Sequence, residues 1–172
     1  VDNPTVSWNF YLISDGYQKF YSKDALTTSN GETFKPATGT RLLASFTLLS
    51  EKTGDVNNVR IFSCVVVPVE TLTKITEENQ DSIKNDPYYV SGSPYINGDN
   101  IMNLITTFSA AKSSEQTFYL IQDTTKTDGK CHLDRRFTND AKGETTTLMA
   151  PLNFNLSTLQ ADFRDSVRIV LY

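Results

Sequence analysis

Several features that support catalysis or membrane insertion are scarce in this chain of 172 residues. It has one histidine and two cysteines, and no apolar run approaches the ~18–20 residues that a membrane-spanning helix needs. A zinc site needs three or four converging Cys, His or carboxylate ligands, so we expect no metal site. The chain also lacks a P-loop, a G-x-G-x-x-G turn and a G-x-S-x-G elbow, which predicts no nucleotide cofactor and none of the usual hydrolase chemistry.

Positive charge is scarce as well. The net charge is −4, the pI is about 5.0, and no basic run is longer than Arg135-Arg136. Nucleic-acid-binding domains normally carry a basic stripe, so we expect no nucleic-acid partner.

The few chemically reactive side chains do not form a recognisable site. His132, the only histidine available for a Ser–His–Asp triad, falls on the polar side of a predicted strand with Asp134 and Arg136. We therefore interpret it as a solvated or cross-strand-paired imidazole, name no catalytic residue, and predict that the protein is not an enzyme. Cys64 and Cys131 lie in different halves of the chain, and two interpretations stay open: buried free thiols, or a disulfide between the halves.

Residues that favour β-structure are abundant in the chain. Ten Phe and eight Tyr accompany many Val, Ile and Thr residues, which favour strands. Alternating polar and apolar residues predict strands over 41–49, 130–139 and 148–156, and the Asp15-Gly16 pair predicts a hairpin between 8–13 and 17–21. Residues 52–58 read as a polar connection and 88–98 as turn-rich. Strands separated by short polar turns are typical of a β-sandwich.

One segment, residues 72–87, differs from the rest. It is acidic, and Thr76 could cap a short helix with Glu77 and Glu78 in its first turn, before Asp86-Pro87 ends it. We predict a helical connector between two β domains, 1–71 and 88–172. We also expect the connector to pack against both domains and hold them as one rigid body, with Ile83 and Tyr88 buried between them.

The connector carries a specific resemblance. The sequence VETLTKITEENQDSIKNDPYYV resembles the junction of the NigD-like family of bacterial envelope lipoproteins, in which a threonine-leucine-threonine step leads into EEN-x-DSI-x-NDP. The matching residues are Glu77, Glu78, Asn79, Asp81, Ser82, Ile83, Asn85, Asp86 and Pro87. The flanking stretches FYLISDGYQKFYS, TRLLASFTLLSE and LNFNLSTLQ…DSVRIVLY are also similar to that family, so the resemblance covers nearly the whole chain.

The resemblance implies an all-β protein with an N-terminal OB-like barrel and a C-terminal immunoglobulin-like β-sandwich. It also implies export to the cell envelope and an outer-membrane lipid anchor on a cysteine that this sequence does not include, so membrane association would occur only through that anchor. The chain departs from the family pattern in its C-terminal half, where we expect a final hairpin strand to be missing. The family is named after a bacteriocin gene cluster, which gives bacteriocin immunity as one alternative function. It brings no catalytic residues.

Binding is the function class that remains. We expect a non-enzymatic module whose partner is an envelope protein or a glycan, with carbohydrate binding as a second alternative. Aromatic side chains serve both kinds of interface, although core packing accounts for many of them. The candidate ligand-binding residues are Trp8, Tyr11, Tyr88, Tyr89 and Tyr95.

Overall fold

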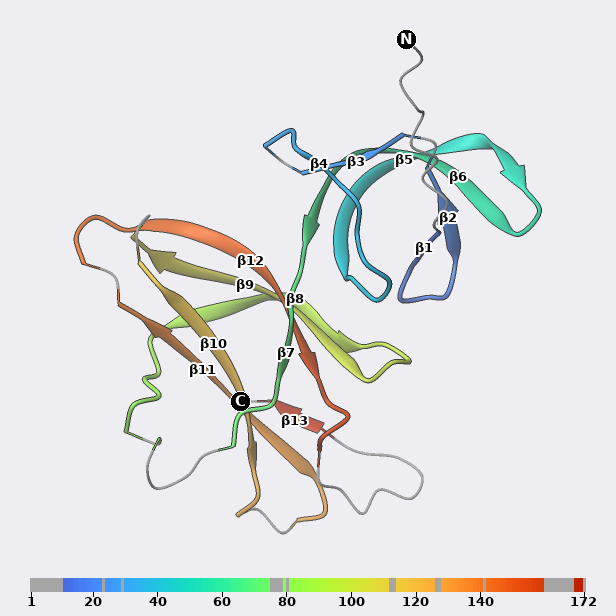
Figure 1. The fold of residues 1–172 in the computed structure, drawn as a ribbon. Coiled ribbons are helices and arrows are strands. Elements are labelled where there is room, and N and C mark those ends of the chain that lie inside the picture. The colour runs from blue at the N-terminus through green and yellow to red at the C-terminus, as the bar shows by residue number, and fades with distance from the viewer. Residues whose placement is uncertain are drawn as a thin grey trace. The chain divides into compact units, whose positions relative to one another are not determined.

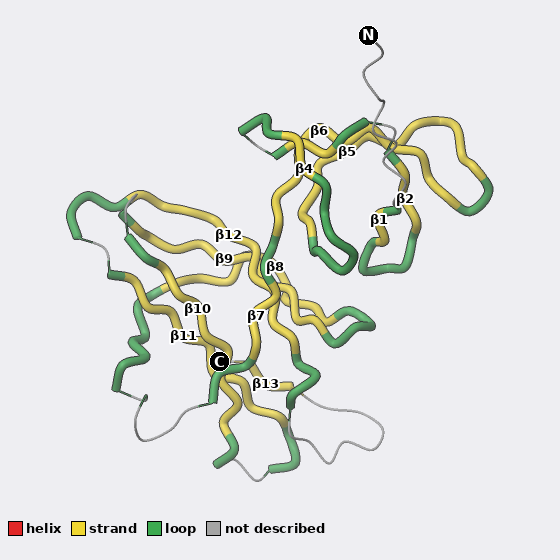
Figure 2. The backbone as a smooth tube through the Cα atoms, in the orientation of Figure 1, coloured by secondary structure: helices red, strands yellow, loops and turns green. Residues whose placement is uncertain are grey.

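The computed structural model describes residues 11–22, 24–28, 30–74, 79, 81–111, 114–125, 128–140, 142–159 and 169–171. Throughout these ranges the regular elements are β-strands, and no helix occurs that could span a membrane (Figures 1 and 2). The prediction of an all-β chain is thus confirmed. The chain divides into two compact units, Val1–Pro68 and Val69–Tyr172.

The first unit is built on a four-stranded sheet in the order β1-β2-β6-β5, with a separate β3–β4 hairpin. The predicted hairpin at Asp15-Gly16 is present, since β1 and β2 pair antiparallel around it. In the described residues this sheet does not close into a barrel, so the OB-like barrel is not confirmed. The strands are β1 (Leu12–Ile13), β2 (Lys19–Tyr21), β3 (Leu26–Thr27), β4 (Thr33–Phe34), β5 (Leu42–Thr53) and β6 (Val56–Val66).

The β5–β6 hairpin is longer than the sequence predicted. Residues 52–58, expected to form a polar connection, are mostly strand, and only Gly54-Asp55 turns, with Gly54 at a positive φ of 64°. The polar residues of this stretch belong to the adjoining ends of the two strands. Lys52 of β5 pairs there with Asn57 of β6, and Thr53 pairs with Val56. Further along, inward-facing residues of β6 form the core of this unit together with Leu26 from β3. The buried core residues are Leu26, Val59, Ile61 and Cys64.

The second unit has two sheets, of order β7-β12-β9-β8 and β10-β11-β13. Apolar residues of β9 and β12 on one sheet share a buried core with residues of β10 and β11 on the other. The strand order differs from the immunoglobulin pattern, in which the first strand lies next to the second, so the immunoglobulin-like subtype is not confirmed. The strands are β7 (Val69–Thr71), β8 (Tyr88–Ile96), β9 (Ile101–Ala110), β10 (Gln116–Asp123), β11 (Cys131–Asn139), β12 (Thr146–Asn155) and β13 (Ile169–Leu171).

Strand β8 occupies the stretch that the sequence predicted to be turn-rich. Its pairing with β9 is interrupted between Ser91 and Tyr95, where Gly92 adopts a positive φ of 76° and Pro94 follows. An edge strand tolerates proline and an irregularity of this kind, because the bulged residues need no second partner strand. The turn-forming residues Gly92 and Pro94 therefore lie in the bulge of an edge strand, and the stretch is not the series of turns that the sequence predicted.

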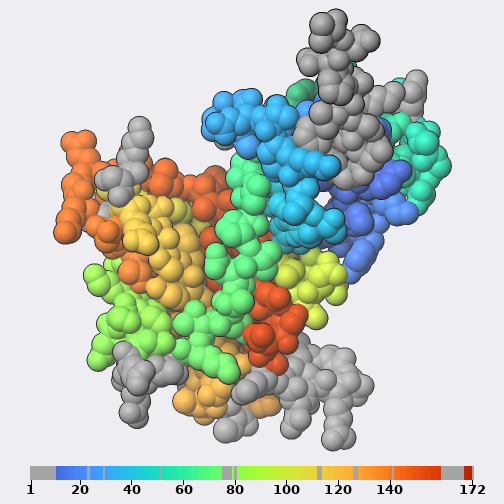
Figure 3. Space-filling view, viewed as in Figure 1, coloured from blue at the N-terminus to red at the C-terminus, as the bar shows by residue number. Residues whose placement is uncertain are grey.

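The connector is attached to the second unit. Near its start, the Thr73 N–H donates to the Leu120 carbonyl of β10 (2.9 Å). Near its end, the Asp86 N–H donates to the Phe137 carbonyl of β11 (2.8 Å), and the Asn139 N–H donates to the Asp86 carboxylate (2.8 Å). Figure 3 shows the described part of this segment, in green, next to the yellow and orange atoms of β10 and β11.

The helical form of the connector is not confirmed. Its predicted cap and first turn, Thr76 to Glu78, lie outside the described residues, and the described remainder contains a turn in which the Ile83 N–H donates to the Asn79 carbonyl (3.2 Å). Ile83 is only 7% exposed, whereas its predicted location between the two domains stays a prediction. The ring neighbours of Tyr88 are phenylalanines of the second unit, so its partners lie in that unit's own core. The rigid-body arrangement of the two domains stays a prediction.

Candidate binding surface

The four-stranded sheet of the second unit has one face in the core and one face turned away from it. Met102, Leu104 and Phe108 of β9 point inward. Side chains alternate along a strand, so the intervening positions of β9 and their cross-strand partners share the other face. We call this surface the outer face. It comprises Tyr89, Ser91, Tyr95, Asn103, Ile105, Thr107, Met149, Pro151 and Asn153.

Strand register arranges these residues in rows across β8, β9 and β12. In the first row, Thr107 lies between Tyr89 and Met149, and in the second, Ile105 lies between Ser91 and Pro151. The third row places Asn103 between Tyr95 and Asn153, which in turn pairs with Val69 of β7. Residues from four separate parts of the sequence are thereby brought onto one surface.

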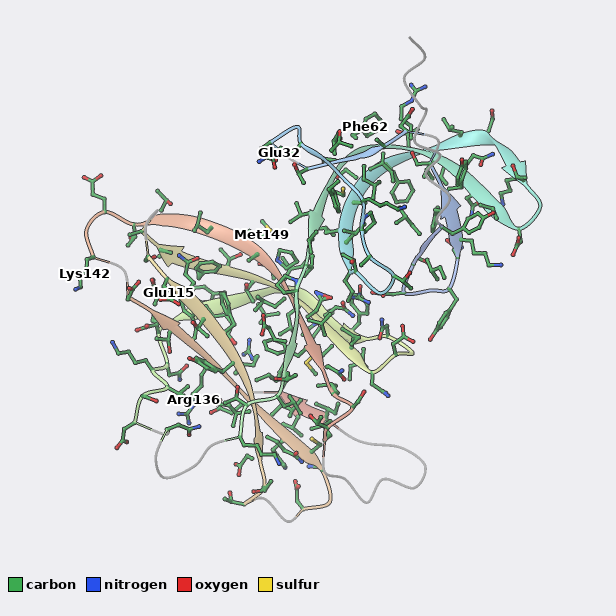
Figure 4. All side chains as sticks on the ribbon, viewed as in Figure 1. Glu32, Phe62, Glu115, Arg136, Lys142 and Met149 are labelled. Carbon is green, nitrogen blue, oxygen red and sulfur yellow. The ribbon has the colours of Figure 1, made fainter. Side chains whose placement is uncertain are left out.

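The first two rows of the outer face expose three large apolar side chains, those of Tyr89, Ile105 and Met149. Tyr89 is 75% exposed and Met149 70%, the highest values for large hydrophobic residues within the described ranges, and Ile105 is 45% exposed. The Met149 side chain projects from β12 (Figure 4). No residue of the outer face carries a charge, and the hydroxyls of Ser91 and Thr107 hydrogen-bond to each other (2.9 Å). An apolar, uncharged surface of this kind is suited to binding another apolar surface.

Of the five aromatic residues predicted from the sequence, the four that the structure describes fall in three different settings. Tyr89 and Tyr95 lie together on the outer face, and Tyr95 is 54% exposed. Tyr11 belongs to the first unit, where it is 61% exposed with its ring centroid 6.0 Å from that of Tyr21. Trp8 lies outside the described residues.

Tyr88 points to the opposite side of β8 from Tyr89. Its ring lies edge-on to Phe118 and Phe137, each with a centroid separation of 5.8 Å, and the Arg135 guanidinium lies 5.5 Å from its ring centre. Burial raises the pKa of Tyr88 to about 12. A neutral, half-buried phenol in an aromatic cluster acts in packing, which is the alternative that the sequence left open.

Met149 and Ile105 also belong to the outer face, but the candidates predicted from the sequence were all aromatic and did not include them. The alternation of side chains along the predicted strand 148–156 could have identified Met149. If Leu152 and Phe154 face the core, Met149 must face away from it. The same reasoning applies to Ile105, which lies next to the core residue Leu104. Searching for exposed apolar side chains in general, instead of aromatic ones alone, would have included both.

His132 is buried, so the solvated alternative of the prediction is wrong, whereas the alternative of a paired imidazole agrees with its bond to Asp128. It is only 5% exposed, although it lies on the side of β11 opposite the core residues Cys131 and Leu133. Ile121 of the neighbouring strand, on that same side, is 2% exposed, so both faces of this sheet are covered here. The prediction took polar neighbours as a sign of solvent, but the polar face of a short sheet can itself be covered.

The His132 ring has a carboxylate partner in the β10–β11 loop. Its Nε2 lies 2.8 Å from Asp128 Oδ1, and the Lys130 N–H also donates to that oxygen (3.2 Å). The bond to His132, assisted by Lys130, lowers the pKa of Asp128 to about 2. Among the described residues no group of three or more His, Cys, Asp or Glu side chains could hold a metal ion.

The cysteines are both free and buried, one in each unit. The alternative of a disulfide between the halves is therefore wrong. Burial raises the pKa of both thiols, so they remain protonated at neutral pH.

Comparison with known proteins finds relatives by structure alone: no family model and no curated protein sequence matches this chain. A NigD-like immunity protein from Bacteroides caccae superposes with a TM-score of 0.64 at 22% identity, covering 86% of this chain and 73% of its own. A putative toxin-related protein from Parabacteroides distasonis gives 0.70 at 18% identity, covering 99% and 81%. A putative lipoprotein from Bacteroides fragilis gives 0.68 at 12% identity, covering 94% and 80%.

These similarities show a shared fold. The resemblance to the NigD-like family, seen first in the connector sequence, is confirmed at that level by the structural match to a NigD-like protein.

Proposed function

We propose that this chain, which has the NigD-like fold, is a non-enzymatic module of the bacterial cell envelope that binds a protein partner through the outer face. The observation that carries the proposal is the row Tyr89–Thr107–Met149, whose two outer side chains are the most exposed large hydrophobic residues in the described part of the chain. Exposed apolar side chains that gather on one face often mark a site of protein interaction.

The chemistry of the face favours a protein over a glycan. Tyr and Met are enriched at protein interfaces, where a large apolar side chain supplies contact area. Sugar recognition needs aromatic rings together with convergent hydrogen-bonding groups. Ser91 and Thr107, the polar residues between the exposed apolar side chains, already bond to each other.

The non-enzymatic part of the proposal is supported by the surroundings of the one histidine. His132 is buried and bonded to Asp128, so its ring is not presented to a substrate as a general base would be. An envelope location is supported by the names of two fold neighbours, a putative lipoprotein and an immunity protein. Under this proposal, a lipid anchor on a cysteine not included in this sequence would hold the module at the outer membrane.

A capture experiment with matched variants tests the binding proposal. Wild-type protein, Tyr89→Ser and Phe62→Ser are immobilised and exposed to envelope extract, and captured proteins are quantified by mass spectrometry. Phe62 is the control because it is an aromatic residue of the first unit, 61% exposed on β6 (Figure 4). We expect a specific protein that wild type and Phe62→Ser capture equally and that Tyr89→Ser loses by at least about tenfold, the effect of removing an interface hot spot.

Two outcomes contradict the proposal. If every captured protein binds Tyr89→Ser as well as wild type, the outer face is not the binding surface. If a glycan panel instead gives saturable binding that depends on Tyr89, the ligand is a carbohydrate, which is the alternative derived from the sequence.

Immunity to a bacteriocin is the second candidate function. Its support is the printed name of one fold neighbour, the NigD-like immunity protein. Such a role fits the same outer face, with a toxin as its partner. Deleting the gene should then sensitise cells to a bacteriocin produced by related strains, with rescue by the wild-type gene and not by the Tyr89→Ser gene; unchanged sensitivity would remove this candidate.

A further inference from the structure

The chain has two methionines and two cysteines, and their surroundings differ sharply. Met102 is 3% exposed in the core of the second unit, and Cys64 and Cys131 are 1% and 2% exposed. Met149, by contrast, is 70% exposed in the middle of β12. One sulfur atom of the four is therefore open to reagents in solution.

We propose that Met149 is a modification site, at which a hydroperoxide converts the thioether to a sulfoxide while the other three sulfur atoms of the folded protein stay reduced. A thioether sulfur needs no deprotonation to react, so access decides which methionine is oxidised. Residues exposed only through local opening react in proportion to how often they open.

The reaction balances with the peroxide as the only co-reactant. The lone pair of Met149 Sδ attacks one peroxide oxygen, a sulfur–oxygen bond forms and the oxygen–oxygen bond breaks. Sulfur loses two electrons, which the peroxide gains, and the proton on the attacked oxygen passes to the departing hydroxide. The products are one sulfoxide and, from hydrogen peroxide, one water.

The cysteines, normally the more reactive residues, are protected by packing. The thiolate is the form that attacks peroxides. Cys64 is surrounded by the core of the first unit, and its Sγ–H donates to the Thr27 carbonyl (3.3 Å). Cys131 lies in the core of the second unit beside Leu133. Burial keeps both as neutral thiols and blocks the approach of the oxidant.

Oxidation at this position would change the outer face directly. The sulfoxide is a polar group with a strong hydrogen-bond acceptor, placed in the same row as Tyr89. A partner that covers this row with apolar atoms would leave the acceptor unsatisfied, which weakens binding. This consequence rests on the proposed function, whereas the modification itself does not.

Peptide mass spectrometry after graded exposure to hydrogen peroxide tests the modification. Lys112 and Arg135 separate the two methionines into different tryptic peptides, and the gain of one oxygen atom is followed in each. We expect Met149 to oxidise at least about tenfold faster than Met102, because Met102 reacts only after opening of the core. In protein unfolded by urea, both peptides should oxidise at similar rates. The Met149→Leu variant should gain no oxygen in the folded state at the same dose.

Comparable oxidation of Met102 or of either cysteine in the folded protein would overturn the proposal. The effect on binding is measured separately, by repeating the capture experiment with untreated wild type, with oxidised wild type and with oxidised wild type that methionine sulfoxide reductases have reduced again. Loss of capture by oxidised wild type alone, by about tenfold, supports the link to the outer face. Selective oxidation with unchanged capture would refute that link and leave the modification site standing, so the two failures are distinguishable.

Discussion

The attachment of the connector to the second unit leads to a quantitative prediction for Ile83→Asp. Ile83 is 7% exposed, so folding removes nearly its whole side chain from water, which contributes ~1.5–3 kcal/mol. An aspartate there must either lose its hydration or detach the segment. Detachment would break the two hydrogen bonds that Asp86 makes with β11, each contributing ~0.5–1.5 kcal/mol. We expect a loss of ~2–4 kcal/mol in the free energy of unfolding.

Urea unfolding of the full chain, followed by far-ultraviolet circular dichroism, measures this loss. The matched control is Ser82→Asp, which introduces the same charge at the neighbouring exposed position. Hydrogen exchange locates the effect: amides of β10 and β11 should lose protection, whereas amides of β5 and β6 should not. The reasoning is refuted if Ile83→Asp costs no more than Ser82→Asp, within ~0.5 kcal/mol, or if protection falls equally in both units.

Further predictions concern the two cores and the hydrogen bond between His132 and Asp128. Phe137→Ala should lower the free energy of unfolding by ~3–5 kcal/mol in urea, because the Phe137 ring is 1% exposed and stacks on the Phe118 ring with the centroids 4.5 Å apart. A loss below ~1 kcal/mol would contradict that packing. Ile61→Ala should cost ~2–4 kcal/mol and the adjacent, exposed Phe62→Ala less than ~0.5 kcal/mol, and equal costs would reverse the assigned faces of β6. Asp128→Asn should lower the urea midpoint near neutral pH, where the wild-type carboxylate is charged and bonded to His132. Since folding lowers the Asp128 pKa from 3.8 to about 2, its contribution is full above the unfolded value and is lost as the pH falls toward 2, so the two midpoints should converge in that range. A difference that persists at pH 2 would refute this assignment.

The sequence predicted much of the fold, because local patterns determine much of it. The Asp15-Gly16 hairpin and the inward alternation of Leu133 and Phe137 follow from turn chemistry and from the two-residue period of a strand. By the same period, the outer face could be derived from residues that precede or follow core positions. What the period cannot give is the register that places Tyr89 and Met149 in one row, since they are sixty positions apart.

The predictions that failed depended on contacts between distant segments. Gly92 and Pro94 indicate a turn when considered locally, yet pairing with β9 keeps them in a bulged strand. The solvated alternative for His132 was inferred from its polar neighbours, whereas its burial depends on what covers that side of β11. Whether a sheet closes into a barrel is likewise a property of strand pairing, which composition does not determine.

Site-specific photo-crosslinking in cells tests the central claim most directly. A photoreactive phenylalanine analogue replaces Tyr89 in one strain and Phe62 in another, and crosslinked products are identified after irradiation. We predict that position 89 yields a discrete crosslink to one protein and that position 62 does not. An absence of crosslinks at position 89, or the same products at both positions, would contradict the assignment of the outer face as the binding surface.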